Sequence, residues 1–344
     1  MTDASDAEPR RVTVRTVAAA AKVSTATVSR VMSGLPTVDP ELAARVRRVA
    51  EELAYRPNEN ARSLALGSLR NIGVLMPDLA NSYFHEIIKQ LHRAAAPAGF
   101  RMLIADHTGE PDDEYAAAAD LIGHVDGLVL LSPRMPRSRL RALARESTPV
   151  VLVNRVEFGV DLPMIGADSF TAMLAVGAHL VALGHRRVVY LSGNELAWQD
   201  RERWRGIQAG RALGLDVTRV ECDGTFETSY DVADQTLVHG PTAIICFNDL
   251  SALGLMARLR DLGTSVPDDI SVVGFDDIPI GRHAFPSLTT LRSPREELGR
   301  RAWEILETSL DRQPVDEQPV LLPAPLIIRQ STGPVRRERD NMHE

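Results

Sequence analysis

The sequence predicts an α/β protein in which an N-terminal three-helix domain of the helix-turn-helix type precedes a two-lobed core of doubly wound parallel sheets. Two observations carry this prediction. Residues 12–57 contain short amphipathic stretches that suit small helices, whereas apolar runs from Asn71 onward alternate with amphipathic stretches, as in repeated strand–helix–strand units. With 344 residues and 44% hydrophobic side chains, the chain is long enough for several units that each bury a core.

Composition excludes several classes of protein. The N-terminal run MTDASDAEPRR lacks the apolar segment of a secretion signal, and no run approaches the ~18 apolar residues of a membrane span. Cys222 and Cys246 are too few for a disulfide framework and lack zinc-site spacing, and His85, His107 and His124 form no metal-binding pattern. We therefore expect a cytoplasmic protein with no membrane contact, no bound metal and no cofactor.

Charge is unevenly distributed along the chain. The net charge is −7, yet the segment from Arg10 to Arg70 carries eleven basic residues against five acidic ones. A basic segment on an acidic body is typical of a DNA-binding domain attached to a body that does not contact phosphate. The alternative is a chance cluster of solvated arginines.

Three capping signals mark the helices of the N-terminal domain. Thr13 can cap a first helix and Ser24 a second one after a short break. Asp39 followed by Pro40 gives the clearest signal, because proline at the first helical position behind an aspartate cap is a typical helix start. The apolar residues at helical spacing are Val14, Val17, Ala18, Val28, Val31, Met32, Leu42, Val46, Val49 and Leu53.

The second of these helices suits the major groove of double-stranded DNA, where base edges differ in their donors, acceptors and methyl groups. Arg30 can form a bidentate contact with guanine, and Thr25 and Ala26 can offer a hydroxyl or methyl contact. Thr27 and Ser29 suit phosphate contacts better. The alternative is an ordinary surface helix, since three-helix units are common.

Several motifs resemble the lactose-repressor (LacI/GalR) family of bacterial regulators. The segment TVAAAAKVSTATVSRVM, followed by YRPN and ARSL, carries the resemblance first, and LGHRRVVYLSG, RERWRG, CFND, ISVVGFDD and LTTLR continue it from Val12 to about Pro334. One departure is Lys22, where the family usually has glycine in the turn between helices. A lysine there should cost about 1 kcal/mol, because left-handed backbone is unfavourable for a residue with a side chain.

The resemblance implies a sequence-specific DNA-binding transcriptional regulator, most simply a repressor, that binds a near-palindromic operator as a homodimer. It also implies a hinge helix within residues 58–70 that folds on DNA, with Asn58 and Leu64 among the DNA contacts and Leu64 inserted into the minor groove. The alternative for this segment is a mere linker, because Glu59 and Asn60 replace small apolar residues. The ending RQSTGPVRRERDNMHE has no leucine heptads, so we expect a dimer and no tetramer.

The core is expected to span residues 71–334 between disordered tails at 1–11 and 335–344. About nine apolar runs read as strands, which is too many for one doubly wound sheet, and resemblance to periplasmic sugar-binding proteins implies two lobes. We place the first lobe at about 71–165 and 294–321 and the second at about 166–291 and 322–334, with crossings near Gly166, Leu291 and Leu322. The strand runs are NIGVLM, FRMLIA, DGLVLLS, PVVLVN, MIGAD, RRVVYLSG, VTRVEC, TAIICFND and ISVVGFDD.

Polar and aromatic residues gather where these runs end, and ligands of open α/β sheets bind beyond the carboxyl ends of the strands. Amides, carboxylates and arginines beside aromatic rings suit a carbohydrate effector between the lobes. The resemblance supports Arg203, Asn248 and Asp276 most strongly, although Asn248 also suits a helix cap. Arginines at the strand ends leave open an anionic effector. The predicted effector-binding residues are Tyr83, Phe84, Ser132, Arg134, Asn154, Asp168, Trp198, Arg203, Phe226, Asn248 and Asp276.

Two other classes of protein are built on doubly wound sheets. An enzyme on a doubly wound fold would need a motif such as GxGxxG, GxxxxGK[ST], GxSxG or HExxH, and the sequence has none of them. A periplasmic binding protein would need a signal peptide in place of residues 1–66. We therefore expect a regulator and not an enzyme.

Overall fold

The structure is a computed structural model that describes residues 12–32, 38–55, 68–107, 111–315 and 318–336. The chain divides into two compact units, residues 1–70 and 71–344, each described by itself. The predicted tails and the hinge positions Asn58 and Leu64 lie outside the described residues, apart from the first two residues of the C-terminal tail.

The first unit contains three helices whose starts follow the capping signals. Thr13 accepts a hydrogen bond from the backbone N–H of Thr16, and Ser24 accepts one from Thr27. The Asp39 carboxylate accepts from the N–H groups of Glu41 and Leu42, at 3.1 and 3.0 Å. The helices are α1 (Val14–Ala21), α2 (Thr25–Met32) and α3 (Pro40–Glu52).

One apolar core joins these helices, and one expectation about it is wrong. Leu42, at the start of α3, is only partly buried and does not pack on the core that it was expected to join, whereas Ala43 does. Val46 is buried there, and Val49 and Leu53 pack against it, as the helical spacing predicts. Lys22 adopts a left-handed backbone with φ of 55°, as the departure from glycine predicted. The buried core residues are Val17, Ala18, Ala21, Val28, Val31, Ala43, Val46 and Ala50.

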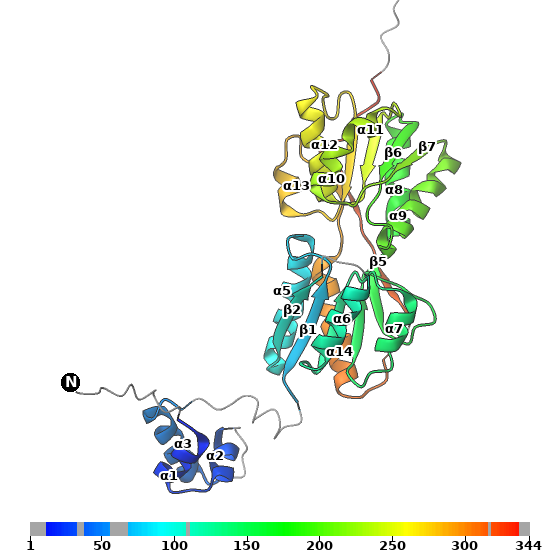
Figure 1. Cartoon of the computed structure of the whole chain (residues 1–344). Coiled ribbons are helices and arrows are strands. Elements are labelled where there is room, and N and C mark those ends of the chain that lie inside the picture. Colours follow the sequence, from blue (N-terminus) through cyan, green and yellow to red (C-terminus); the bar gives the residue numbers. More distant parts are fainter. Residues whose placement is uncertain (1–11, 33–37, 56–67, 108–110, 316–317, 337–344) are drawn as a thin grey trace, which may run out of the picture. The chain divides into compact units, whose positions relative to one another are not determined.

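The second unit has two six-stranded sheets, one in each lobe (Figure 1). The first lobe has the strand order β11-β5-β4-β3-β1-β2, and the second has β12-β10-β9-β8-β6-β7. All pairings are parallel except that of β12 with β10. The first-lobe strands are β1 (Asn71–Met76), β2 (Arg101–Asp106), β3 (Gly127–Leu131), β4 (Val150–Val153), β5 (Met164–Ala167) and β11 (Val320–Leu322), and those of the second are β6 (Arg187–Leu191), β7 (Asp216–Val220), β8 (Ala243–Cys246), β9 (Ser271–Phe275), β10 (Thr289–Leu291) and β12 (Leu326–Ile327).

Helices cover both faces of each sheet, as doubly wound architecture requires. The chain passes between the lobes after β5, after β10 and after β11. Within the described ranges, no helix combines the length and the apolar character needed to cross a membrane. The helices are α5 (Tyr83–Ala95), η1 (Ala96–Ala98), α6 (Pro111–Ile122), α7 (Arg137–Leu143), α8 (Ser169–Ala182), α9 (Trp198–Ala209), η2 (Gly210–Leu213), α10 (Phe226–Asp231), α11 (Ala233–Leu237), α12 (Asp249–Asp261), α13 (Pro279–His283) and α14 (Arg295–Leu310).

Helix α14 returns to the first lobe after the second crossing. Its Leu298, Trp303 and Leu306 share a buried cluster with Ile87 and Leu91 of α5. Burial of a large apolar side chain contributes roughly 1.5–3 kcal/mol, so this packing fixes the last helix on the lobe that began the unit.

Candidate functional site

The exposed face of α2 presents the residues predicted to meet DNA. Thr25, Ala26, Ser29 and Arg30 are exposed, and Thr27 is half-buried. The Arg30 Nε donates to the carbonyl oxygen of Ala26 at 3.3 Å, so in this structure the side chain lies along its own helix.

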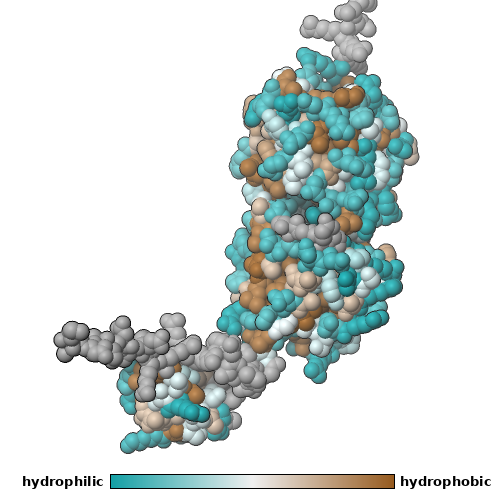
Figure 2. All heavy atoms as spheres, viewed as in Figure 1, coloured by the Kyte–Doolittle hydropathy of each residue, from teal (hydrophilic) through white to brown (hydrophobic). Residues whose placement is uncertain are grey.

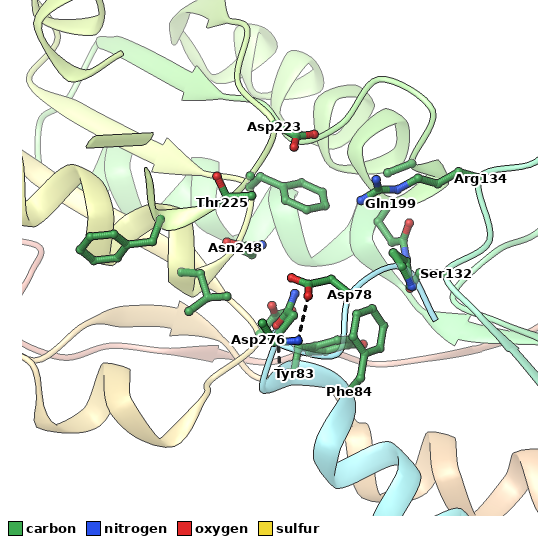
Figure 3. Close-up of a pocket in the computed structure, with 18 of the residues that line it drawn as sticks. Asp78, Tyr83, Phe84, Ser132, Arg134, Gln199, Asp223, Thr225, Asn248 and Asp276 are labelled. Carbon is green, nitrogen blue, oxygen red and sulfur yellow. Dashed lines mark hydrogen bonds between the residues drawn. The ribbon is translucent and has the colours of Figure 1, made fainter. Parts of the chain in front are cut away.

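A pocket of about 480 Å³ lies between the two lobes, at the carboxyl ends of β1 and β3 in the first lobe and of β6 to β9 in the second (Figure 3). Backbone segments from both lobes therefore surround one space, as the strand-end rule predicts. Its lining residues are Pro77, Asp78, Ala80, Asn81, Tyr83, Phe84, Ser132, Arg134, Ala197, Gln199, Arg203, Asp223, Gly224, Thr225, Phe226, Glu227, Phe247, Asn248, Leu250 and Asp276.

Asp276 and Arg203 form the most buried charged pair of the pocket, with 3.8 Å between Oδ1 and Nη2. The Arg203 guanidinium lies 4.5 Å from the ring centre of Phe247 and 3.5 Å from that of Phe275, and it donates to the Phe247 carbonyl oxygen. Burial raises the pKa of Asp276 to about 7, against the opposing effects of Arg203 and Arg295. The carboxyl can therefore accept or donate a hydrogen bond near neutral pH.

Tyr83 is held at the first-lobe side of the pocket. Its hydroxyl lies 3.0 Å from Ser293 Oγ and accepts a hydrogen bond from Asn154 Nδ2 at 2.6 Å. Burial raises its pKa to about 12, and the nearby Asp276 adds to this effect. Tyr83 is therefore a neutral, oriented group that lies between the first lobe and the segment that crosses to it.

A second polar group of residues lies at the other end of the pocket (Figure 3). Gln199 on α9 donates from Nε2 to Ser132 Oγ, which follows β3, at 2.6 Å. This hydrogen bond joins the second lobe to the first. Arg134 lies beside it and extends its guanidinium into the pocket.

Left-handed or strained backbone clusters at these strand ends. Ser132, Asn154 and Asp276 have φ values of 52°, 59° and 121°. Each such residue costs on the order of 1–3 kcal/mol, and such strain is typical of functional sites where the surrounding structure fixes the backbone.

The loop that carries Asp276 is tied down by its neighbours. Asp277 is fully buried and accepts hydrogen bonds from Arg282, Arg292 and Arg329, which hold its pKa below the usual range although burial opposes this. Asp249 accepts from the N–H of Ile278 at 2.8 Å. These contacts place the Asp276 carboxyl at the pocket wall.

Eight of the eleven predicted effector residues line the pocket, and three do not. Asn154 lies behind Tyr83, and the Asp168 carboxylate caps α8 by accepting from Thr171 N–H at 3.0 Å. Trp198 packs into a first-lobe apolar cluster. The eight lining residues are Tyr83, Phe84, Ser132, Arg134, Arg203, Phe226, Asn248 and Asp276.

Sequence reasoning missed several lining residues, among them Asp78, Gln199, Thr225 and Phe247. Asp78 lies two residues after the expected strand run NIGVLM, and Phe247 lies near the end of the run TAIICFND, so their places at strand ends could have identified them. Nothing in the sequence favoured Gln199 over its neighbour Trp198, because that choice depends on how α9 is rotated. Among the described residues, no group of three or more His, Cys, Asp or Glu side chains is placed to hold a metal ion.

Comparison with known proteins gives matches over both units. Residues 13–58 match the family described as bacterial regulatory proteins, lacI family, and residues 178–332 match the periplasmic binding protein-like domain. The HTH-type transcriptional repressor CytR of Escherichia coli (strain K12) is 34% identical over 328 residues, which cover 93% of this chain and 96% of that protein.

Two solved structures extend the likeness to the fold of most of the chain. A Lac repressor dimer bound to operator and the anti-inducer ONPF has a TM-score of 0.84 and 28% identity, covering 94% of this chain and 100% of that one. A complex of the transcriptional regulator CelR with cellobiose has a TM-score of 0.70 and 26% identity, covering 93% of this chain and 100% of that one. The expected α/β class with its two-lobed core is thereby confirmed.

Proposed function

This chain belongs to the lacI family of bacterial regulatory proteins, and on that premise we propose that it is a transcriptional repressor whose affinity for its operator is set by a small molecule in the pocket between the lobes. The observation that carries the proposal is the pairing of two features in one chain. One is an exposed second helix in a helix-turn-helix domain, and the other is a pocket lined from both lobes of a separate core.

The DNA partner is double-stranded and read through the major groove. Arg30 is the candidate for a base contact worth about 1–3 kcal/mol, and Thr25 and Ala26 flank it on the exposed face of α2. Arg30 lies back along α2, so binding would exchange its contact with Ala26 for one with a base. Asn58 and Leu64 belong to the proposal as further DNA contacts.

A homodimer on a near-palindromic operator is the proposed assembly, as in the Lac repressor dimer on its operator. The edge strand β2 supports it, since it pairs on one side only and exposes Leu103 and Ile104. Figure 2 shows apolar surface along this side of the first lobe. An exposed apolar edge favours association with another chain, so we propose that a second copy of this chain packs on β2.

The proposed effector is a carbohydrate or a carbohydrate derivative. Asn248, Asp276 and Arg203 offer an amide, a carboxyl and a guanidinium to ligand hydroxyls, and Phe84 and Phe226 can pack on apolar faces of a sugar ring. The sugar-bound CelR structure supports this class of ligand.

Control of DNA affinity requires that the effector bind two arrangements of the lobes with different affinity. The pocket offers this, because Tyr83 and Ser132 belong to the first lobe, whereas Arg203 and Asp276 belong to the second. A ligand that touches both sets binds most tightly to one relative position of the lobes.

The protein acts as a regulator and not as an enzyme in this proposal, in agreement with the names of the relatives, and it acts in the cytoplasm, where the DNA is.

The test begins by selecting duplexes from a random library with the full chain. Fluorescence anisotropy then compares a selected duplex with its scrambled version, with and without sugars and sugar derivatives. We expect the selected duplex to bind about a thousandfold or more tightly and to show two-fold symmetry. Equal affinity for both duplexes would contradict the proposed function.

A further inference from the structure

We propose that the effector carries an anionic group, a carboxylate or a phosphoryl group, and that Arg134 binds it. This inference rests on the proposed function and specifies the chemical class of the ligand. It starts from the three arginines that the strand ends bring to the pocket region.

Two of these arginines make hydrogen bonds, ion pairs or ring contacts with other residues of the protein. Arg155 donates to the carbonyl oxygens of Pro133 and Met135 and pairs with Glu157 at 2.6 Å. Arg203 pairs with Asp276 and packs between two phenylalanine rings. Both guanidinium groups therefore already have hydrogen-bond or ring contacts within the protein that hold them in place.

Arg134 differs from both. Its side chain lines the pocket, and its guanidinium makes no hydrogen bond or ion pair with any residue that the structure describes. All three arginines have a buried Nε without a partner, so the difference lies in the terminal nitrogens of Arg134. Arg134 is half-buried, and a cation that loses part of its solvent without gaining a partner is unfavourable. Arginine offers a planar set of donors that matches the two oxygens of a carboxylate or phosphate. The pocket thus has a positive group whose missing partner is an anion.

Glu114 positions Arg134 without neutralising its side chain. The Glu114 carboxylate is 1% exposed and accepts from the backbone N–H groups of Arg134 at 2.9 Å and Met135 at 2.5 Å. His107 Nε2 lies 3.3 Å away on its other side. The carboxylate therefore fixes the backbone that follows β3, while the guanidinium remains directed into the pocket.

The acidic residues of the pocket lie with other partners. Asp276 pairs with Arg203, and Asp78 accepts from the N–H of Ala80 at 2.8 Å. Asp223 is exposed and accepts from Asn194 Nδ2 at 3.0 Å, and Glu227 is exposed. Solvent screens the charges of Asp223 and Glu227, so these two carboxylates do not cancel the positive charge beside Ser132 and Gln199.

The first test uses the ions alone. The thermal midpoint Tm of the full chain is measured in inorganic phosphate and in acetate, each against chloride at equal ionic strength. We expect phosphate or acetate to raise Tm for the wild type and for Arg145→Gln, an exposed arginine of the same lobe, and to lose this effect in Arg134→Gln. Equal rises in Arg134→Gln and wild type, or no rise in the wild type, would overturn the proposal.

Glu114→Gln tests the positioning role in the same assay. This variant should lose the anion-dependent rise in Tm, and the double variant with Arg134→Gln should lose nothing more. A full anion response in Glu114→Gln would overturn its positioning role, even if the variant has a lower Tm in chloride.

The second test separates this inference from the proposed function. Release of the selected duplex is compared for glucose, glucuronate and glucose 6-phosphate, so that the neutral, carboxylate and phosphoryl ligands are matched. We expect an acidic ligand to act on the wild type and to act about 10- to 100-fold more weakly on Arg134→Gln. If glucose releases DNA equally well from both proteins, the inference fails while the proposed function stands.

Discussion

The Asp276→Asn substitution should make the ligand-free core more stable at neutral and alkaline pH, although it removes a residue of the pocket. The reason is the burial of Asp276, which is 5% exposed and whose pKa is about 7. The folded carboxyl keeps its proton up to about pH 7, whereas the unfolded one loses it near its ordinary value of 3.8. Between these values the folded state binds more protons, so the free energy of unfolding falls as pH rises.

The size of this effect follows from the two pKa values. One pKa unit is worth about 1.36 kcal/mol, so the wild type loses ~4 kcal/mol across the whole window. About 3 kcal/mol of that loss lies between about pH 5 and about pH 8. Asparagine has no proton to lose there, so the stability advantage of the variant should grow by this amount. The stability difference between variant and wild type is compared at two pH values. Any pH-independent change in the free energy of unfolding that asparagine causes beside Arg203 cancels in this comparison.

Urea unfolding followed by tryptophan fluorescence measures this directly. All three tryptophans, Trp198, Trp204 and Trp303, lie in residues 71–344, so the signal reports the core and not the DNA-binding domain. Asp223→Asn, at an exposed acid of the same pocket, is the matched control and should follow the wild-type pH profile. If the difference in the free energy of unfolding between Asp276→Asn and wild type stayed constant across this pH range, the raised pKa of Asp276 would be refuted as its cause.

Three further predictions concern DNA, effector and assembly. Arg30→Ala should weaken binding to the selected duplex by about 1–3 kcal/mol and relax the sequence preference at one base pair of each half-site. An equal loss of binding free energy on the scrambled duplex in the same titration would identify Arg30 as a phosphate contact. Asp276→Ala should keep operator affinity within about a few-fold of wild type but lose the response to effector. In the wild type, linkage requires that operator DNA change the affinity for effector by the same factor by which effector changes the affinity for operator, typically about 5- to 150-fold. An Asp276→Ala variant that still responds at the wild-type ligand concentration would exclude this role. Sedimentation should show a dimer that Ile104→Asp in β2 weakens and the exposed control Val238→Asp does not, and a wild-type monomer or tetramer would contradict the assembly.

Much of the fold could be predicted because long apolar runs identify buried parallel strands. Three strands were missed, and each is short. β11 pairs with β5 through the register Val320↔Ile165, which joins residues far apart in the sequence. A strand of three residues carries too little pattern to be recognised before its partner is known.

The site was predictable by residue type and less so by geometry. Polar residues at strand ends indicate a pocket, but such a side chain can instead hydrogen-bond to nearby backbone. Asp168 is such a case, because its carboxylate caps α8. Trp198 and Gln199 are neighbours on α9, but their side chains point in different directions. Trp198 packs into an apolar cluster of the first lobe, whereas Gln199 bonds to Ser132. Neither the rotation of a helix nor the distance between the lobes can be predicted from the pattern of residue types.

The polar contacts of the pocket explain why a ligand there would act on the position of the lobes. Gln199 donates a hydrogen bond to Ser132 across the pocket, so this contact joins the two lobes in the relative position that the structure shows. A ligand that bonds to either group must replace that contact, so its affinity includes the cost of breaking it. The net worth of one such bond is about 0.5–1.5 kcal/mol, and a coupling of 1–3 kcal/mol needs only a few contacts of this kind. Arg134 lies beside this bond, and its guanidinium has no hydrogen bond or ion pair among the described residues. An anion bound to it would therefore contact the first lobe next to Ser132, the group that now bonds to the second lobe.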